Sequence, residues 1–206
     1  MLKKIISSGQ TEAELAALDA AIKLEVPHGG WIPKRKLPET GTLPAKYRLQ
    51  EMPTHTYSEC IEQNVIDSKG TLILSCGKPT GNLDFARKMT LKHRHQLLGI
   101  DLDLTNFIEA ASLVHDWIQL RRIDALYVTG SGAAANPDVG NHTTFIVESA
   151  IARNESRGAH FREDFDTRDD ENFLKHTMAY MDENGDISLD YMDVVLGKHE
   201  LKARTY

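Results

Sequence analysis

Short apolar runs and longer amphipathic segments alternate along the first two thirds of the chain. Residues 2–7 are predicted to form a short buried strand. Residues 71–75 form a continuous apolar run, which is typical of a strand covered on both faces. Further strands are expected over residues 96–102 and 124–129. Because amphipathic segments separate these runs, the pattern predicts strands connected by helices.

Two of the predicted helices begin with a capping box. The Thr11 hydroxyl and the Glu14 carboxylate can satisfy free amides at the start of the first helix. Thr56 and Glu59 can do the same for a helix that ends near Asp67. Further helices are predicted over residues 81–94, 105–122 and 138–156, and the second of these carries a clear apolar stripe.

The passage that follows Trp31, up to about His55, is rich in proline and glycine. It is predicted as a long irregular loop, and loops of this length are usually functional. Elsewhere strands and helices alternate. This order predicts an α/β fold with a three-layer Rossmann-like parallel sheet, right-handed crossovers and ligand loops at the carboxyl ends of the strands.

The pattern changes near the C-terminus. Residues 176–195 alternate around Asn184 and Gly185, the strongest short signal for a β-hairpin. We therefore expect a Rossmann-like domain over residues 1–147 and a C-terminal helix plus β-hairpin extension over residues 148–206. The extension would pack as a satellite on the sheet or mediate self-association into a homo-oligomer.

Composition narrows the classes of partner. The chain has 206 residues, of which 41% are hydrophobic and 26% charged, the balance of a folded protein. A net charge of −6 without a basic patch argues against nucleic-acid binding. No window approaches the roughly 20 apolar residues that span a membrane. Two cysteines and the absence of an apolar secretion signal favour the cytoplasm.

Three glycine-bearing loops follow predicted strands, at Gly9, at Gly77 to Gly81, and at Gly130. A glycine turn between a strand and a helix lets backbone amides and the helix dipole hold a phosphate. Three such loops favour a small phosphorylated ligand, although each could also be no more than a tight turn.

Other candidate residues are less specific. Trp31 and Lys34 could line a pocket for a ring and a phosphate, or they could be a buried indole and a solvated cation. His93 and His95 lack an acidic or thiol partner at ligand spacing, so no metal site is expected. Cys76 is interpreted as inert. The sequence therefore indicates no catalytic residue.

Four stretches carry a family resemblance: KKIISSGQTEAELAALDAA, VPHGGWIPK, NVIDSKGTLILS and IDALYVTGS. In this order, over residues 3 to about 147, they resemble the molybdenum carrier family, a YpsA-related branch of Rossmann-like proteins. The resemblance implies a carrier for the molybdenum cofactor (molybdopterin), a pterin with a phosphate, held at the strand ends without turnover. The residues that the resemblance assigns to the cofactor are Gly9, Gln10, Thr11, Gly29, Gly30, Trp31, Pro33, Lys34, Asn64, Asp67, Thr80, Gly81 and Gly130.

Two alternatives stay open. Other Rossmann-like relatives are enzymes that cleave or transfer a nucleotide group. The chain could also be a degenerate scaffold, because Glu12 and Asn82 stand where the family's loops usually have glycine.

A second resemblance concerns the tail. ESAIARNESRGAHFREDFDTRDDENFLKHTMAY and the ending KARTY resemble the extreme C-terminus of the succinate dehydrogenase or fumarate reductase flavoprotein subunit. The flavin-binding and dicarboxylate-binding parts of that family precede this segment, and residues 1–147 do not supply them. The resemblance therefore implies a gene fusion, and no flavin is expected.

Overall fold

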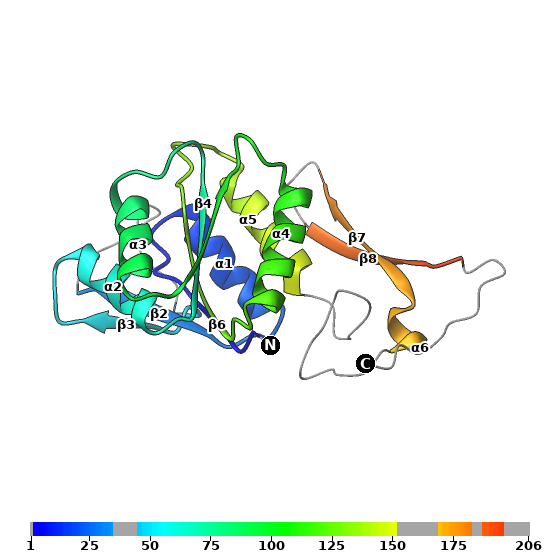
Figure 1. Cartoon of the computed structure of the whole chain (residues 1–206), viewed down its shortest axis with the longest axis horizontal. Coiled ribbons are helices and arrows are strands. Elements are labelled where there is room, and N and C mark those ends of the chain that lie inside the picture. The colour runs from blue at the N-terminus through cyan, green and yellow to red at the C-terminus, as the bar shows by residue number, and fades with distance from the viewer. Residues whose placement is uncertain (1, 35–44, 152–168, 183–186, 196–206) are drawn as a thin grey trace.

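The computed structural model describes residues 2–34, 45–151, 169–182 and 187–195. Its centre is a six-stranded sheet of order β3-β2-β1-β6-β4-β5 in which every pairing is parallel (Figure 1). The strands are β1 (Lys4–Ile6), β2 (His28–Pro33), β3 (Leu49–Met52), β4 (Gly70–Ser75), β5 (Gln96–Asp101) and β6 (Ala125–Gly130).

Helices cover both faces of this sheet (Figure 1). They are α1 (Glu12–Lys23), α2 (Tyr57–Ile66), α3 (Gly81–Lys92), α4 (Phe107–Leu120) and α5 (Val139–Ile151). One hydrophobic cluster joins α1, α4 and α5 to the sheet, and a second joins α2 and α3 to its other face. The predicted three-layer Rossmann-like fold is confirmed.

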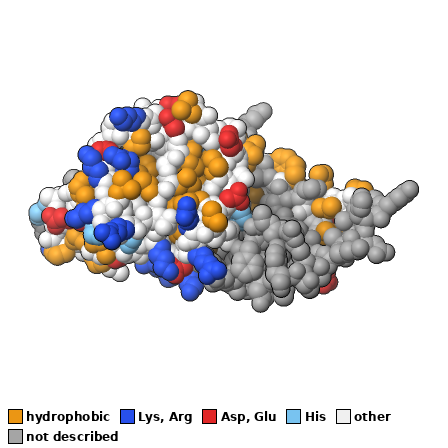
Figure 2. Space-filling model, viewed as in Figure 1, with side chains coloured by type: hydrophobic (Ala, Val, Ile, Leu, Met, Phe, Trp, Pro, Cys, Tyr) orange, Lys and Arg blue, Asp and Glu red, His pale blue; other side chains and the backbone are white. Residues whose placement is uncertain are grey.

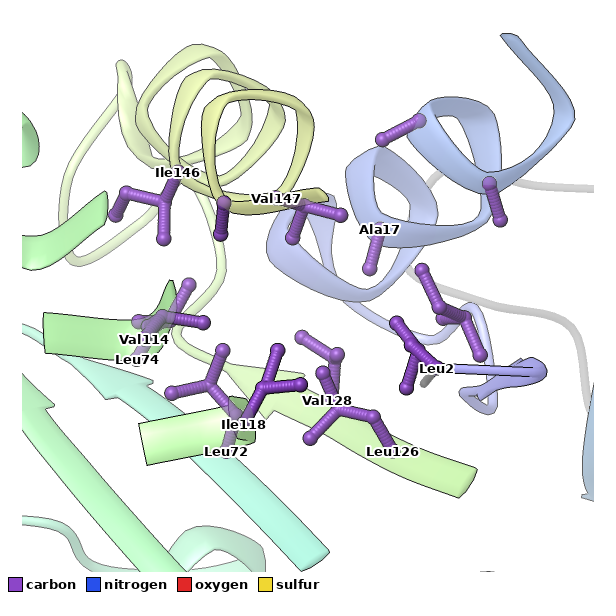
Figure 3. Packing of buried hydrophobic residues seen from close by; sticks show 14 of the residues in the cluster. Leu2, Ala17, Leu72, Leu74, Val114, Ile118, Leu126, Val128, Ile146 and Val147 are labelled. Atoms are coloured by element: carbon purple, nitrogen blue, oxygen red, sulfur yellow. The ribbon is translucent and has the colours of Figure 1, made fainter. Parts of the chain in front are cut away.

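The larger cluster shows why the central strands lie where they do. Leu72 and Leu74 of β4 and Leu126 and Val128 of β6 lie on the face of the sheet that α1, α4 and α5 cover, in one cluster with Val147 (Figure 3). All six residues of β4 are buried, as expected for a strand covered on both faces. The continuous apolar runs of the sequence therefore mark the middle of the sheet.

The prediction of an irregular passage between Trp31 and His55 is wrong in part, because β3 and the last two residues of β2 lie within it. These strands occupy one side of the sheet and contain few large apolar residues, so they lack the pattern of β4. Glycine is required at Gly30, where a Cβ atom would overlap the carbonyl oxygen of Ser7. This close approach lets β2 lie directly against β1.

The two predicted capping boxes have different outcomes. Thr11 caps α1, since its hydroxyl accepts the Glu14 amide at 3.3 Å. At α2 the prediction is wrong, because Thr56 makes no side-chain cap and its hydroxyl instead donates to Glu59 Oε1 at 2.6 Å.

The C-terminal extension contains α6 (Asp170–Phe173) and an antiparallel hairpin of β7 (Lys175–Met181) and β8 (Ile187–Asp193). This confirms the predicted hairpin, whereas α6 was not predicted; Asn184 and Gly185 lie outside the described residues. Ile187 is buried against α4 and α5, whereas other hydrophobic side chains lie on the outside of the hairpin (Figure 2). Among the described residues, no helix is long and apolar enough to cross a membrane.

Candidate functional site

Three predicted glycine loops meet at the carboxyl edge of the sheet, because β1, β6 and β4 are neighbours. The Thr11 hydroxyl donates to the Gly130 carbonyl at 3.1 Å, which ties the loop after β1 to the end of β6. The Ser131 hydroxyl accepts the Cys76 amide at 3.1 Å, which ties the loop after β6 to that after β4. The structure therefore brings Gly9, Gln10, Thr11 and Gly130 into one region.

Glu14 lies beneath the first loop and is almost completely buried. Its carboxylate accepts the Gln10 amide at 2.8 Å, the Thr129 hydroxyl at 2.6 Å and the Tyr57 hydroxyl at 3.1 Å. Burial nevertheless raises the pKa of Glu14, and these hydrogen bonds offset only part of that effect. The first loop is thus held in shape by a carboxyl group of its own helix.

The Glu12 side chain also accepts a hydrogen bond from within the protein. Its Oε2 atom accepts the backbone amide of Ala133, in the loop after β6, at 2.7 Å. A carboxylate therefore already uses a donor that a ligand phosphate would need. Neither Glu12 nor Glu14 was among the candidate residues, because the Ala133 amide and the Thr129 hydroxyl that they accept lie more than 100 positions away in the sequence.

The loop between β4 and α3 has a different character. Thr80 gives α3 no side-chain cap. Among the described residues, the structure shows no acceptor for the amides of Gly81 and Asn82. Gly81 has a φ of +53°, and a Cβ there would meet open space. Lys78 is exposed in the same loop. Free amides, a helix dipole and a cation therefore coincide here.

Cys76 begins this loop. Burial, together with the nearby carboxylate of Asp103, raises the pKa of its thiol. The thiol is therefore mostly protonated at neutral pH, which makes it a poor nucleophile. Among the described residues, no group of three or more His, Cys, Asp or Glu side chains could hold a metal ion.

The remaining candidates lie elsewhere on β2 and α2. Gly29, Gly30, Trp31 and Asp67 line a cavity of about 220 Å³ on the face that α2 covers. The Trp31 indole donates to Asp67 Oδ2 at 2.7 Å. Most of the predicted cofactor-binding residues are thus divided between the strand ends and this cavity.

Asn64, Pro33 and Lys34 belong to neither group. Asn64 is fully buried, and its side chain bonds to Ser8 and to both backbone polar groups of Trp31. Pro33 is buried, while Lys34 is exposed and its amide donates to the Thr54 carbonyl at 3.0 Å.

A fully parallel sheet with helices on both faces and glycine loops at its carboxyl edge defines a Rossmann-like protein. The chain belongs to the circularly permutated YpsA SLOG family, whose model matches residues 5–151. A similar solved structure is a protein from Syntrophus aciditrophicus SB for which a role as a molybdenum carrier is proposed. The two are 41% identical with a TM-score of 0.69, and the match covers 73% of this chain and 95% of that one.

The C-terminal part is similar to other proteins. A model of the fumarate reductase flavoprotein C-terminus matches residues 123–206. The flavoprotein subunit of the 8-methylmenaquinol:fumarate reductase of Wolinella succinogenes is 53% identical over 57 residues, which are 28% of this chain and 9% of that protein. The fumarate reductase flavoprotein subunit of Haemophilus influenzae is 49% identical over 61 residues, 30% of this chain and 10% of that protein. The chain therefore spans about a tenth of the length of these curated relatives.

Proposed function

We propose that this protein is a carrier that holds the molybdenum cofactor, a pterin with a phosphate, and releases it unchanged. The observation that carries the proposal is the likeness to the Syntrophus protein, which extends over nearly the whole of that chain at 41% identity. The strand-end loops described above lie within the part of this chain that matches the family model.

The phosphate would bind at the start of α3. The amides of Gly81 and Asn82 have no acceptor among the described residues, and the helix dipole adds partial positive charge there. Lys78 supplies a full charge in the same loop. The loops after β1 and β6 are less suited to this role, because Glu12 and Glu14 already accept their amides.

The side chains near the carboxyl edge of the sheet support a protein that holds its ligand without converting it. The Cys76 thiol has a raised pKa, so it is not an activated nucleophile. The Glu14 carboxylate is buried and engaged by three donors. We therefore place neither residue in a catalytic role.

The bond between Glu12 and Ala133 favours a second candidate function. In a degenerate scaffold, an internal carboxylate would have replaced the ligand anion, and the family fold would serve association alone.

The cytoplasmic location, self-association and the division of the chain between residues 147 and 148 stay predictions from the sequence.

Native mass spectrometry with metal analysis of the freshly purified protein separates these functions. The carrier predicts a retained pterin mass together with molybdenum. A retained nucleotide would support a nucleotide-processing enzyme and contradict the carrier. A folded protein without any ligand, even from cells that make the cofactor, would support the scaffold.

A further inference from the structure

The cavity beside β2 lies away from the strand-end loops. Lys4 is the first residue of β1, His28 is the first of β2, and Arg48 directly precedes β3. The cavity therefore opens toward the amino ends of these strands. Lys4 and Ile6 share one face of β1, and Ile6 packs in the cluster that contains α2. The cavity thus lies on the α2 face, near the end of that helix.

The charges that line this cavity are unbalanced. Lys4 and Arg48 form no ion pair with any described residue. The Asp67 carboxylate is the acidic group of the lining, but both its oxygens accept from neutral donors, the Trp31 indole at 2.7 Å and the Gln63 amide at 2.8 Å. The lining therefore carries two cations and one carboxylate, and the oxygens of that carboxylate are held by neutral donors instead of by the cations.

The backbone of β2 leaves room for these cations. A Cβ on Gly29 would lie 3.6 Å from Lys4 Cε and 3.8 Å from Lys4 Nζ, so the lysine side chain lies across the space above this glycine. The cavity volume of about 220 Å³ exceeds the roughly 30 Å³ share of one water molecule several times. A small polyatomic anion therefore fits.

We propose that this cavity is a binding site for a tetrahedral oxyanion, free or as a phosphate group, held by Lys4 and Arg48. The guanidinium of Arg48 can bind two oxygens at once, and the Lys4 ammonium adds a point charge. Gln50 and His28 add polar groups to the same lining. The site goes beyond the proposed carrier role, because none of its residues belongs to the strand-end loops.

Calorimetric titration of the full chain with inorganic phosphate, and separately with molybdate and with a phosphate monoester, tests this site at low ionic strength. We expect saturable binding of at least one anion. Lys4→Gln and Arg48→Gln should each weaken it about tenfold, which corresponds to about 1.4 kcal/mol. Stronger binding of molybdate or inorganic phosphate than of a phosphate monoester would identify a free oxyanion, and the reverse order would identify a phosphate group.

Lys3→Gln is the matched control, because Lys3 is exposed, adjacent in sequence and absent from the cavity lining. It removes the same charge and should weaken binding less than about twofold. Equal losses in the Lys3 and Lys4 variants would show a general charge effect and overturn the site, as would the absence of saturable binding.

Asn82→Asp separates this site from the proposed carrier site. It places a negative charge at the start of α3 and should leave the Lys4-dependent binding unchanged. If Asn82→Asp abolishes all anion binding, the cavity is not the site. If binding persists in this variant but vanishes in Arg48→Gln, the cavity site stands even where the carrier role fails.

Discussion

With a single side chain, Asn64 of α2 binds both β2 and the loop after β1. Its Oδ1 accepts the Trp31 amide at 2.8 Å, and its Nδ2 donates to the Ser8 hydroxyl at 2.8 Å and to the Trp31 carbonyl at 3.3 Å. Because all of these polar groups are held by one amide, their pairing depends on the residue at this position. The family resemblance assigns Asn64 to the cofactor, whereas its bonds give it a place in the fold.

Replacing Asn64 by leucine keeps the volume and removes these bonds. We predict a free energy of unfolding lower by about 2–4 kcal/mol, because buried donors and acceptors lose their partners. Urea unfolding followed by tryptophan fluorescence measures the difference. Gln63→Leu, on the neighbouring position of α2, should cost less than about 1 kcal/mol, because its bond to Asp67 is exposed. Equal costs for the two variants would contradict this role of Asn64.

Glu14 gives the fold a characteristic pH dependence. Burial raises the pKa of its carboxyl group in the folded chain above the ordinary value. Such a group favours folding below its unfolded pKa, and this contribution is lost as the pH rises through the folded pKa. We predict that the free energy of unfolding of the native chain, minus that of Glu14→Gln, falls as the pH rises from about 4.

Urea titrations of both proteins at several pH values provide this difference. Carboxyl groups elsewhere, such as those of Glu62 and Asp84, have lowered pKa values and act in the opposite sense. They are present in both proteins and cancel in the difference. A difference that rises with pH would mean that the hydrogen bonds from Thr129, Gln10 and Tyr57 outweigh burial.

At the scale of elements, Glu12 links the start of α1 to the loop after β6. Replacing it by glycine removes a favourable charge from the first turn and lowers helix propensity, so we predict a loss of about 1–2 kcal/mol in the free energy of unfolding. The same change frees the Ala133 amide and should tighten the binding of a phosphorylated ligand. Calorimetry and thermal melting measure the two effects.

The control is Glu12→Gln, which retains an oxygen that can accept from Ala133 and should bind the ligand as weakly as the native chain. Equal or weaker binding by Glu12→Gly, with the fold intact, would show that the loops after β1 and β6 form no phosphate site. The start of α3 would then be the remaining candidate site for the phosphate at this edge.

The hairpin is attached to the sheet domain through few contacts. Ile187 packs against Ala111 and Phe145, and Lys23 Nζ donates to the Ile187 carbonyl at 3.0 Å and to Glu148 at 2.8 Å. The Glu148 bond lies within the part of the chain that ends at α5, so it does not depend on the hairpin.

We predict that a chain ending at Ile151 unfolds cooperatively, with a free energy of unfolding lower by about 1.5–3 kcal/mol, the contribution of one buried isoleucine. Circular dichroism during urea unfolding follows the transition. In the full chain, Ile187→Ala should cause part of this loss, whereas Ser188→Ala, at an exposed position, should cause almost none. A chain ending at Ile151 without a cooperative transition would show that the extension is integral to the fold.

For the whole molecule, the sequence predicts the layers better than the sites. The apolar runs of β4 and β6 are visible in the sequence because a strand buried on both faces of a sheet requires continuous apolar residues. The apolar stripe of α4 is visible because one face of this helix is buried. The strand β3 reads LQEM and has partly or fully exposed residues, so nothing in its composition distinguishes it from a loop.

The candidate site shows the same limit. The glycine loops could be found, because each directly follows an apolar strand. The hydrogen bond from Ala133 to Glu12 could not be found in this way, and neither could the shared cavity of Lys4 and Arg48. Only the strand order brings these residues together. The cavity in particular depends on β3, the strand that lacks a sequence signal.

If the protein holds the molybdenum cofactor and returns it unchanged, as proposed, the cofactor can be recovered intact from the complex. The direct measurement is to incubate the protein with the cofactor under anaerobic conditions, remove unbound material, denature the complex and identify the released compound by mass spectrometry. We expect intact cofactor with its phosphate, in about equimolar amount and constant over hours. Release of a dephosphorylated or otherwise altered pterin, or no retention by the folded protein, would contradict it.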